Sequence, residues 1–108
     1  MDAQELFNVL RKAQEPKGYF FSRDMDKTLD LLDALLVNRK RYGYMGCPCR
    51  LNKGDNEADR DIICPCDYRA ADVNEYGSCY CGLYVAKEVN DGMTAPQYVP
   101  ERRPAEKC

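Results

Sequence analysis

Apolar residues recur at helical spacing in two stretches of the first half of the chain. The earlier stretch covers residues 2–14, where Leu6 and Leu10 fall on one face. Asp2 begins this stretch as a capping residue, and Pro16 follows shortly after its end. The pattern therefore predicts a short amphipathic helix over residues 2–14.

The later stretch is the longest periodic segment of the sequence. Leu29, Leu32 and Leu36 are three or four residues apart within residues 24–42, and Gly43 follows directly. Glycine commonly follows a helix because it adopts the left-handed conformation without steric cost. We therefore expect a long helix over residues 24–42.

The pattern changes after the long helix. Two short helices are predicted, at residues 56–61 and 67–76, and the apolar run 83–85 is too short to assign. The last segment has three prolines among charged residues, which is typical of an extended or mobile chain. We expect a mainly α, small single-domain helical fold over residues 1–92 and an extended or mobile tail over residues 93–108.

Composition excludes several classes of function. The 108 residues correspond to one domain, and the absence of histidine excludes Ser–His–Asp hydrolysis and His-ligated zinc. A net charge of −2 does not favour nucleic-acid binding, and no apolar run approaches the roughly 20 residues of a membrane span. The acidic N-terminus lacks the features of a secretion signal, so we expect a cytoplasmic protein with reduced thiols.

Cysteine carries the candidate chemistry. Six of the seven cysteines form three pairs with one residue between partners: Cys47-Pro48-Cys49, Cys64-Pro65-Cys66 and Cys79-Tyr80-Cys81. This spacing differs from the Cys-x-x-Cys of thioredoxin-type motifs and from the wider gaps usual in structural zinc sites. Proline fixes its own φ and disfavours helix at the preceding residue, so we expect the first two pairs to be held on rigid turns.

Six clustered thiols divide most simply into four plus two. A [4Fe–4S] cluster is held by four thiolates, and the other two could form a redox-active disulfide beside it. A closed four-cysteine zinc site with two spare thiols and a soft-metal carrier are alternatives. A structural disulfide domain is disfavoured by a reducing compartment. The residues alone leave the metal open.

A wider pattern surrounds the pairs. From residue 19 to residue 85, roughly two-thirds of the chain, the sequence resembles the catalytic subunit of ferredoxin–thioredoxin reductase. The order of two Cys-Pro-Cys units and one Cys-x-Cys is more specific than any single pair. The resemblance rests on four motifs and the long helix: Tyr19-Phe20-Phe21-Ser22, Cys47-Pro48-Cys49-Arg50, Cys64-Pro65-Cys66 and Cys79-Tyr80-Cys81.

The resemblance implies a role for each of the six cysteines. The ligands of a [4Fe–4S] cluster would be Cys47, Cys64, Cys66 and Cys79. Cys49 and Cys81 would form the active-site disulfide, with Cys49 as the attacking thiol and Cys81 as the cluster-associated one. The implied enzyme takes electrons one at a time from ferredoxin and reduces a thioredoxin-like protein disulfide. Plant-type members also have a small second subunit.

The sequence departs from the plant-type pattern at the third pair. Tyr80 stands where plant-type members carry an active-site histidine, which suggests a divergent bacterial or archaeal-type branch. The unperturbed pKa of tyrosine is about 10, so Tyr80 is a candidate hydrogen-bond donor but a poor proton shuttle. Packing against the cluster is the alternative role. Two other functions also stay open: a non-catalytic zinc or soft-metal module, and an iron–sulfur electron carrier or redox sensor.

Charge is distributed unevenly around the cysteines. No acidic residue lies between residues 34 and 54, whereas five basic ones do: Arg39, Lys40, Arg41, Arg50 and Lys53. We predict that they form a docking surface for an acidic ferredoxin, with a solvated helix end as the alternative. In the tail, we expect Arg102 and Arg103 to be solvated and Cys108 to be an incidental exposed thiol.

Overall fold

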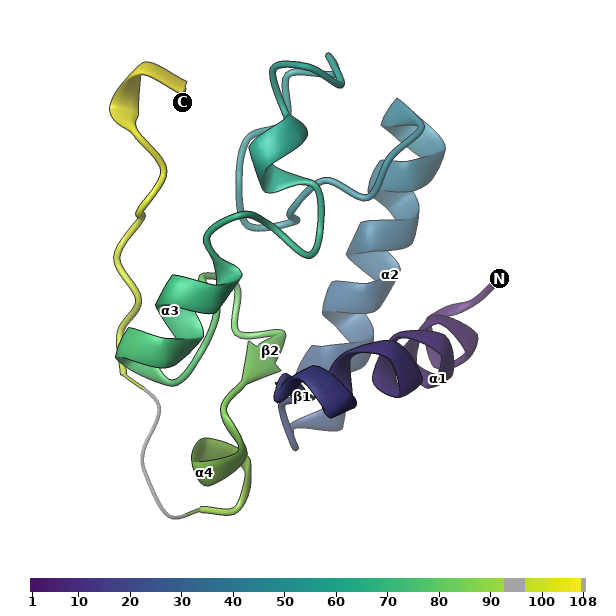
Figure 1. Ribbon diagram of the computed structural model, residues 1–108. Helices are drawn as coiled ribbons and strands as arrows, with labels where there is room; N and C mark the ends of the chain where they lie inside the picture. The colour runs from purple at the N-terminus through teal and green to yellow at the C-terminus, as the bar shows by residue number, and fades with distance from the viewer. Residues whose placement is uncertain (93–96, 108) are drawn as a thin grey trace.

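Two helices form the N-terminal half of the fold. The computed structural model describes residues 1–92 and 97–107. α1 (Ala3–Gln14) lies across α2 (Met25–Tyr42), as Figure 1 shows. Each begins after an aspartate, Asp2 or Asp24, whose carboxylate accepts a backbone N–H three residues further on, at 2.9 and 3.2 Å. The two helices predicted from periodicity are thus confirmed, each to within one residue.

The buried face of α2 centres on three residues in successive turns. Thr28, Leu32 and Leu35 are each 0% exposed, whereas Met25 at the helix start is 38% exposed. Thr28 tolerates burial because its hydroxyl donates to the carbonyl of Ser22 at 2.9 Å. The core face of α2 is therefore set by contact with α1 and the sheet, and includes one satisfied polar side chain.

A two-stranded antiparallel sheet joins the two halves of the chain. β1 (Phe20–Phe21) pairs with β2 (Tyr84–Val85), with Phe21 opposite Tyr84. The rings of Phe21 and Tyr84 stack at 5.0 Å between centroids. No strand was expected here, because a two-residue strand is too short to produce an alternating pattern in the sequence. The sheet brings the third cysteine pair against the helical core.

The remaining helices are short. They are η1 (Glu15–Lys17), η2 (Arg60–Ile62), α3 (Arg69–Tyr76), α4 (Lys87–Asn90) and η3 (Ala105–Lys107). The predicted helix at residues 67–76 is confirmed as α3, but the helix predicted at residues 56–61 is wrong. That segment is a series of turns leading into η2.

The carboxylate of Asp59 explains the missing helix. It is fully buried and accepts from the backbone N–H groups of Lys53 at 2.9 Å and Gly54 at 3.1 Å, and from the hydroxyl of Tyr44. An aspartate that binds neighbouring backbone donors offers the chain an alternative to the helix. The segment therefore folds around Asp59 as a loop.

The C-terminal segment 97–107 runs along the cysteine-bearing half (yellow in Figure 1). The expectation that both of its arginines are solvated is wrong for Arg103, whereas Arg102 is exposed and ion-paired. Arg103 is 4% exposed and donates to both carboxylate oxygens of Asp61, at 2.9 and 3.1 Å. Arg102 donates to the buried Asp72 at 2.8 Å. Buried carboxylates need cationic or hydrogen-bonding partners, and this segment supplies them.

No helix in residues 1–92 or 97–107 combines the length and apolar character needed to cross a bilayer.

Candidate functional site

The first two cysteine pairs lie side by side, although they are far apart in the sequence. The backbone N–H of Cys47 donates to the carbonyl of Ile62, and that of Cys64 donates to the carbonyl of Met45, each at 2.8 Å. An antiparallel bridge between Gly46 and residue 63 sits between these bonds. The loop after α2 and the loop before α3 are thus tied together at the two cysteine motifs.

The third pair sits in a tight turn at the start of β2. The N–H of Cys79 donates to the carbonyl of Tyr84 at 2.9 Å, and the N–H of Tyr84 donates back to the sulfur of Cys79 at 3.3 Å. Gly82, with a φ of 80°, closes the turn, and a Cβ there would lie 2.7 Å from Nζ of Lys27. The pairing of β2 with β1 fixes this turn against the core.

One pocket gathers sulfur from all three pairs. Its lining consists of Cys47, Arg50, Cys64, Cys66, Arg69, Cys79, Tyr80, Cys81 and Tyr84. The four cysteines implied as cluster ligands are all among them. Cys49 instead lies on a neighbouring, more open depression lined also by Cys81, Lys27 and Tyr80. Cys81 therefore borders both the sulfur-lined pocket and the exposed thiol of Cys49.

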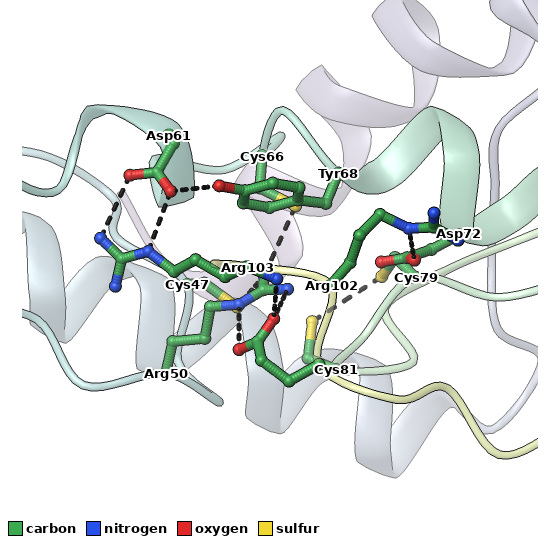
Figure 2. Close-up of polar contacts among 11 residues, drawn as sticks. Cys47, Arg50, Asp61, Cys66, Tyr68, Asp72, Cys79, Cys81, Arg102 and Arg103 are labelled. Atoms are coloured by element: carbon green, nitrogen blue, oxygen red, sulfur yellow. Dashed lines mark hydrogen bonds and ion pairs between the residues drawn. The ribbon is translucent and has the colours of Figure 1, made fainter. Parts of the chain in front are cut away.

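The sulfurs at this junction are in contact. All six cysteines of the three pairs are free thiols, and the sulfur of Cys81 lies 3.8 Å from that of Cys79 (Figure 2). Hydrogen bonding to Cys47 and Cys49 also contributes to the pKa of the Cys81 thiol.

This arrangement separates the thiol pKa values. Donation to its three neighbours raises the pKa of Cys81 well above its usual range. The hydrogen bond from Cys81 lowers the pKa of Cys49 to about 7; burial opposes this, and the positive charges of Lys27 and Arg50 assist it. Cys49 is exposed, so the most accessible thiol of the group also has thiolate character near neutral pH.

Arg50 is buried at the sulfurs rather than displayed on the surface. It is 9% exposed, and its Nη1 donates to Cys47 at 3.7 Å and to Cys66 at 3.6 Å (Figure 2). Its expected place in a basic docking surface is therefore wrong. The other four basic residues of that set are exposed: Arg39, Lys40, Arg41 and Lys53. A signal in the sequence was available, since Arg50 directly follows the first Cys-Pro-Cys motif.

Tyr80 is half-buried beside Arg50. The carbon at the centre of the Arg50 guanidinium lies 4.5 Å from the centre of the Tyr80 ring. Burial raises the pKa of Tyr80, so its phenol is protonated at neutral pH. The last cysteine, Cys108, lies outside the described residues.

The residues around the pocket fit a sulfur-ligated cluster. Its four candidate ligands are all thiols, and no carboxylate is among its lining residues. A donor set of sulfur alone suits iron–sulfur clusters and zinc. Tyr84, a residue 1% exposed, lines the same pocket, and its hydroxyl has no hydrogen-bond partner of normal geometry in the described chain. Sulfide acceptors in the pocket would satisfy that donor. Within the described residues, no three side chains converge as a site for a single metal ion.

Six thiols gathered beside a small helical core define a thiol-based redox or metal-binding protein. Comparison with known proteins narrows this class. A family model described as "Ferredoxin thioredoxin reductase catalytic beta chain" matches residues 2–103, so the chain belongs to this family. The resemblance inferred from residues 19–85 is therefore confirmed, and it extends over nearly the whole chain.

A curated relative agrees with the family assignment. The chain is 31% identical over 71 residues to "Ferredoxin-thioredoxin reductase, catalytic chain" from Guillardia theta. The matched region covers 64% of this chain and 66% of the relative. The chain thus spans just under two-thirds of that protein's length.

Proposed function

We propose that this protein is an iron–sulfur disulfide reductase that takes electrons from ferredoxin and reduces a thioredoxin-like protein disulfide. The observation that carries the proposal is the position of Cys81. It borders both the pocket lined by four other cysteines and the exposed, low-pKa thiol of Cys49. Family membership and the name of the curated relative support the same activity.

In this proposal the pocket holds the cofactor. The ligands of a [4Fe–4S] cluster are the four cysteines that line it apart from Cys81: Cys47, Cys64, Cys66 and Cys79. A bound cluster supplies one-electron chemistry next to a dithiol that must exchange two electrons. Tyr84 lines the same pocket, and Arg50 hydrogen-bonds to two of the ligand sulfurs.

Cys49 and Cys81 then carry out thiol–disulfide exchange. The Cys49 thiolate attacks one sulfur of the acceptor disulfide, which forms a mixed disulfide and releases the other acceptor sulfur as a thiolate. Cys81 attacks the Cys49 sulfur, which releases the reduced acceptor and leaves a Cys49–Cys81 disulfide. Two electrons from two ferredoxins, with two protons, restore both thiols. Tyr80 supplies a protonated hydroxyl as a hydrogen-bond donor at this site and a ring that packs on Arg50.

The free-energy change favours this direction. Plant-type ferredoxins have potentials of about −400 mV and thioredoxin has a potential of about −270 mV, a difference of roughly 130 mV. For a two-electron couple this corresponds to about 6 kcal/mol in favour of acceptor reduction.

Electron delivery requires a docking site for ferredoxin. We assign it to the exposed basic residues at the C-terminal end of α2 and in the following loop: Arg39, Lys40, Arg41 and Lys53. Charge reversal at Arg39 and Arg41 should raise the KM for ferredoxin and weaken its salt dependence. If neither changes, ferredoxin docks elsewhere. A small second subunit, as the term "catalytic chain" implies for the relative, is a further expected partner.

Two measurements test the proposal. Protein purified without oxygen should contain iron and acid-labile sulfide and reduce thioredoxin when supplied with reduced ferredoxin. Cys49→Ser and Cys81→Ser should each keep the iron and abolish turnover, whereas Cys108→Ser should leave turnover unchanged. Zinc in place of iron would identify a metal-binding module, and iron with no loss of function in the two variants would identify an electron carrier.

A further inference from the structure

The guanidinium of Arg50 joins two of the three cysteine pairs. Its side chain is 3% exposed. A single nitrogen, Nη1, donates to the sulfur of Cys47 from the first pair and to that of Cys66 from the second. Both sulfurs belong to the proposed cluster ligands. Arg50 is therefore a buried cation in direct contact with two of the proposed ligands.

The opposite edge of the same guanidinium is held by a carboxylate. Nε and Nη2 of Arg50 donate to the two oxygens of Glu101 at 2.8 and 2.7 Å, in a bidentate ion pair. The rings of Tyr80 and Tyr68 lie 4.5 and 5.3 Å from the guanidinium carbon. The plane of the group is thus fixed by a fork of hydrogen bonds and by two aromatic neighbours.

Glu101 is itself fixed by contacts within the C-terminal segment. The backbone N–H of Arg103 donates to Glu101 at 2.9 Å, and the side chain of Arg103 is bound to Asp61. Asp61 also accepts from the hydroxyl of Tyr68 at 2.5 Å. A chain of polar contacts therefore links the tail to the sulfur pocket through one carboxylate, that of Glu101.

These contacts have opposite electrostatic effects at the pocket. N–H donors and positive charge at ligand sulfurs favour the more reduced, more negative state of an iron–sulfur centre and raise its potential. Glu101 places a negative charge on the far side of the guanidinium and reduces that effect.

We propose that Arg50 is a positioning residue that holds the sulfurs of Cys47 and Cys66 and raises the reduction potential of the centre they bind, with Glu101 as the counter-charge that limits the increase. The inference rests on the proposed function, because it takes the pocket as a cluster site. It gives the C-terminal segment a role in the redox chemistry, since Glu101 comes from that segment.

The test compares three variants of the full-length holoprotein: Arg50→Gln, Glu101→Gln and Arg102→Gln. The readout is the midpoint potential of the visible absorption change in a mediator titration without ferredoxin or acceptor. Arg50→Gln should lower the potential and Glu101→Gln should raise it. Each shift should be of the order of a tenfold change in the ratio of reduced to oxidised protein, about 59 mV for a one-electron couple.

Arg102→Gln is the matched control. Arg102 is the neighbour of Glu101, and its guanidinium pairs with Asp72 and Glu75 rather than with sulfur. Removal of its charge should leave the potential within error of the wild type. A shift as large as that of Arg50→Gln would mean that general charge, not contact with the sulfurs, sets the potential, and the inference would be wrong.

The remaining outcomes are also decisive. Shifts of the same sign in Arg50→Gln and Glu101→Gln, or no shift in either, overturn the inference while leaving the proposed function intact. If Arg50→Gln fails to retain iron, the comparison of Glu101→Gln with Arg102→Gln decides: a higher potential in Glu101→Gln alone supports the inference, and no rise in Glu101→Gln overturns it. A wild-type protein without iron and sulfide overturns the proposed function and the inference together.

Discussion

The helical half and the cysteine-bearing half of this molecule are stabilised in different ways. In residues 3–42, the buried side chains are mostly apolar, led by Leu32 and Leu35, and the N-terminal ends of the two helices are capped by nearby side chains. Residues 44–107 bury several charged groups, including Asp61 and Arg103, which meet across 42 residues of sequence. The stability of the helical half therefore comes from a local apolar pattern, and that of the cysteine-bearing half comes from pairs of polar groups that are distant in the sequence.

The difference between the two halves explains how the six thiols are held close to one another. A close-packed apolar core holds the two strands and the turn at Cys79 in place. The cysteine loops have little apolar surface of their own, so ion pairs and, in our proposal, a cluster give them their shape. Apolar packing on one side and polar contacts on the other thus bring six thiols together without a large core.

Cofactor removal should produce the largest difference between the halves. After iron is removed with a chelator under reducing conditions, amides in residues 44–92 should exchange at least about tenfold faster, and those of α1 and α2 less than about twofold faster. Hydrogen exchange with mass spectrometry measures both. A uniform increase along the chain would show that the halves unfold as one unit.

A cavity in the helical half should have the next largest effect, a loss of stability. Leu35→Ala removes a fully buried side chain from α2 and should reduce the free energy of unfolding by about 3 kcal/mol. Leu51→Ala is the matched control, because Leu51 is 89% exposed and its loss should cost less than about 0.5 kcal/mol. Urea unfolding followed by circular dichroism measures both, and equal losses would contradict the assigned core.

The cysteine-bearing half should become less stable when one of its buried charges is removed. Asp61→Asn weakens the pair with Arg103 and should reduce the free energy of unfolding by about 2 kcal/mol at pH 7. Asp67→Asn, at an exposed site, is the control.

The effect at Asp61 should depend on pH. Burial raises the pKa of Asp61, but hydrogen bonds from Arg103 and Tyr68 outweigh it and lower the pKa from 3.8 to about 2. Because the folded-state value is depressed, the stabilisation is present above about pH 4 and is lost as the pH falls toward 2. The gap between the wild type and Asp61→Asn should therefore close over that range, and a gap independent of pH would argue against the ion pair.

The smallest effect is expected at a helix cap. Asp24→Ala removes the acceptor for the first turn of α2 and should cost about 1 kcal/mol. Asp30→Ala, an exposed position within the same helix, should have a smaller effect, and thermal unfolding compares the two. Equal costs would mean that the cap contributes nothing beyond general charge.

The sequence by itself determined the two long helices, because a period of three to four apolar residues and the capping residues are local properties of the chain. The six cysteines and the family were also readable from spacing and order, and all six do lie together. The helix at residues 56–61 was predicted wrongly, since Asp59 binds backbone donors that a periodicity analysis does not consider.

Only the tertiary structure decided the surroundings of the thiols. Arg50 is buried against two sulfurs, and its pairing with Glu101 joins residues 51 positions apart. The pairing of β1 with β2 and the contact of Arg103 with Asp61 are likewise long-range. The sequence shows where a charged residue stands, but not whether water or a distant carboxylate will be its hydrogen-bond partner. Only the folded chain determines that partner.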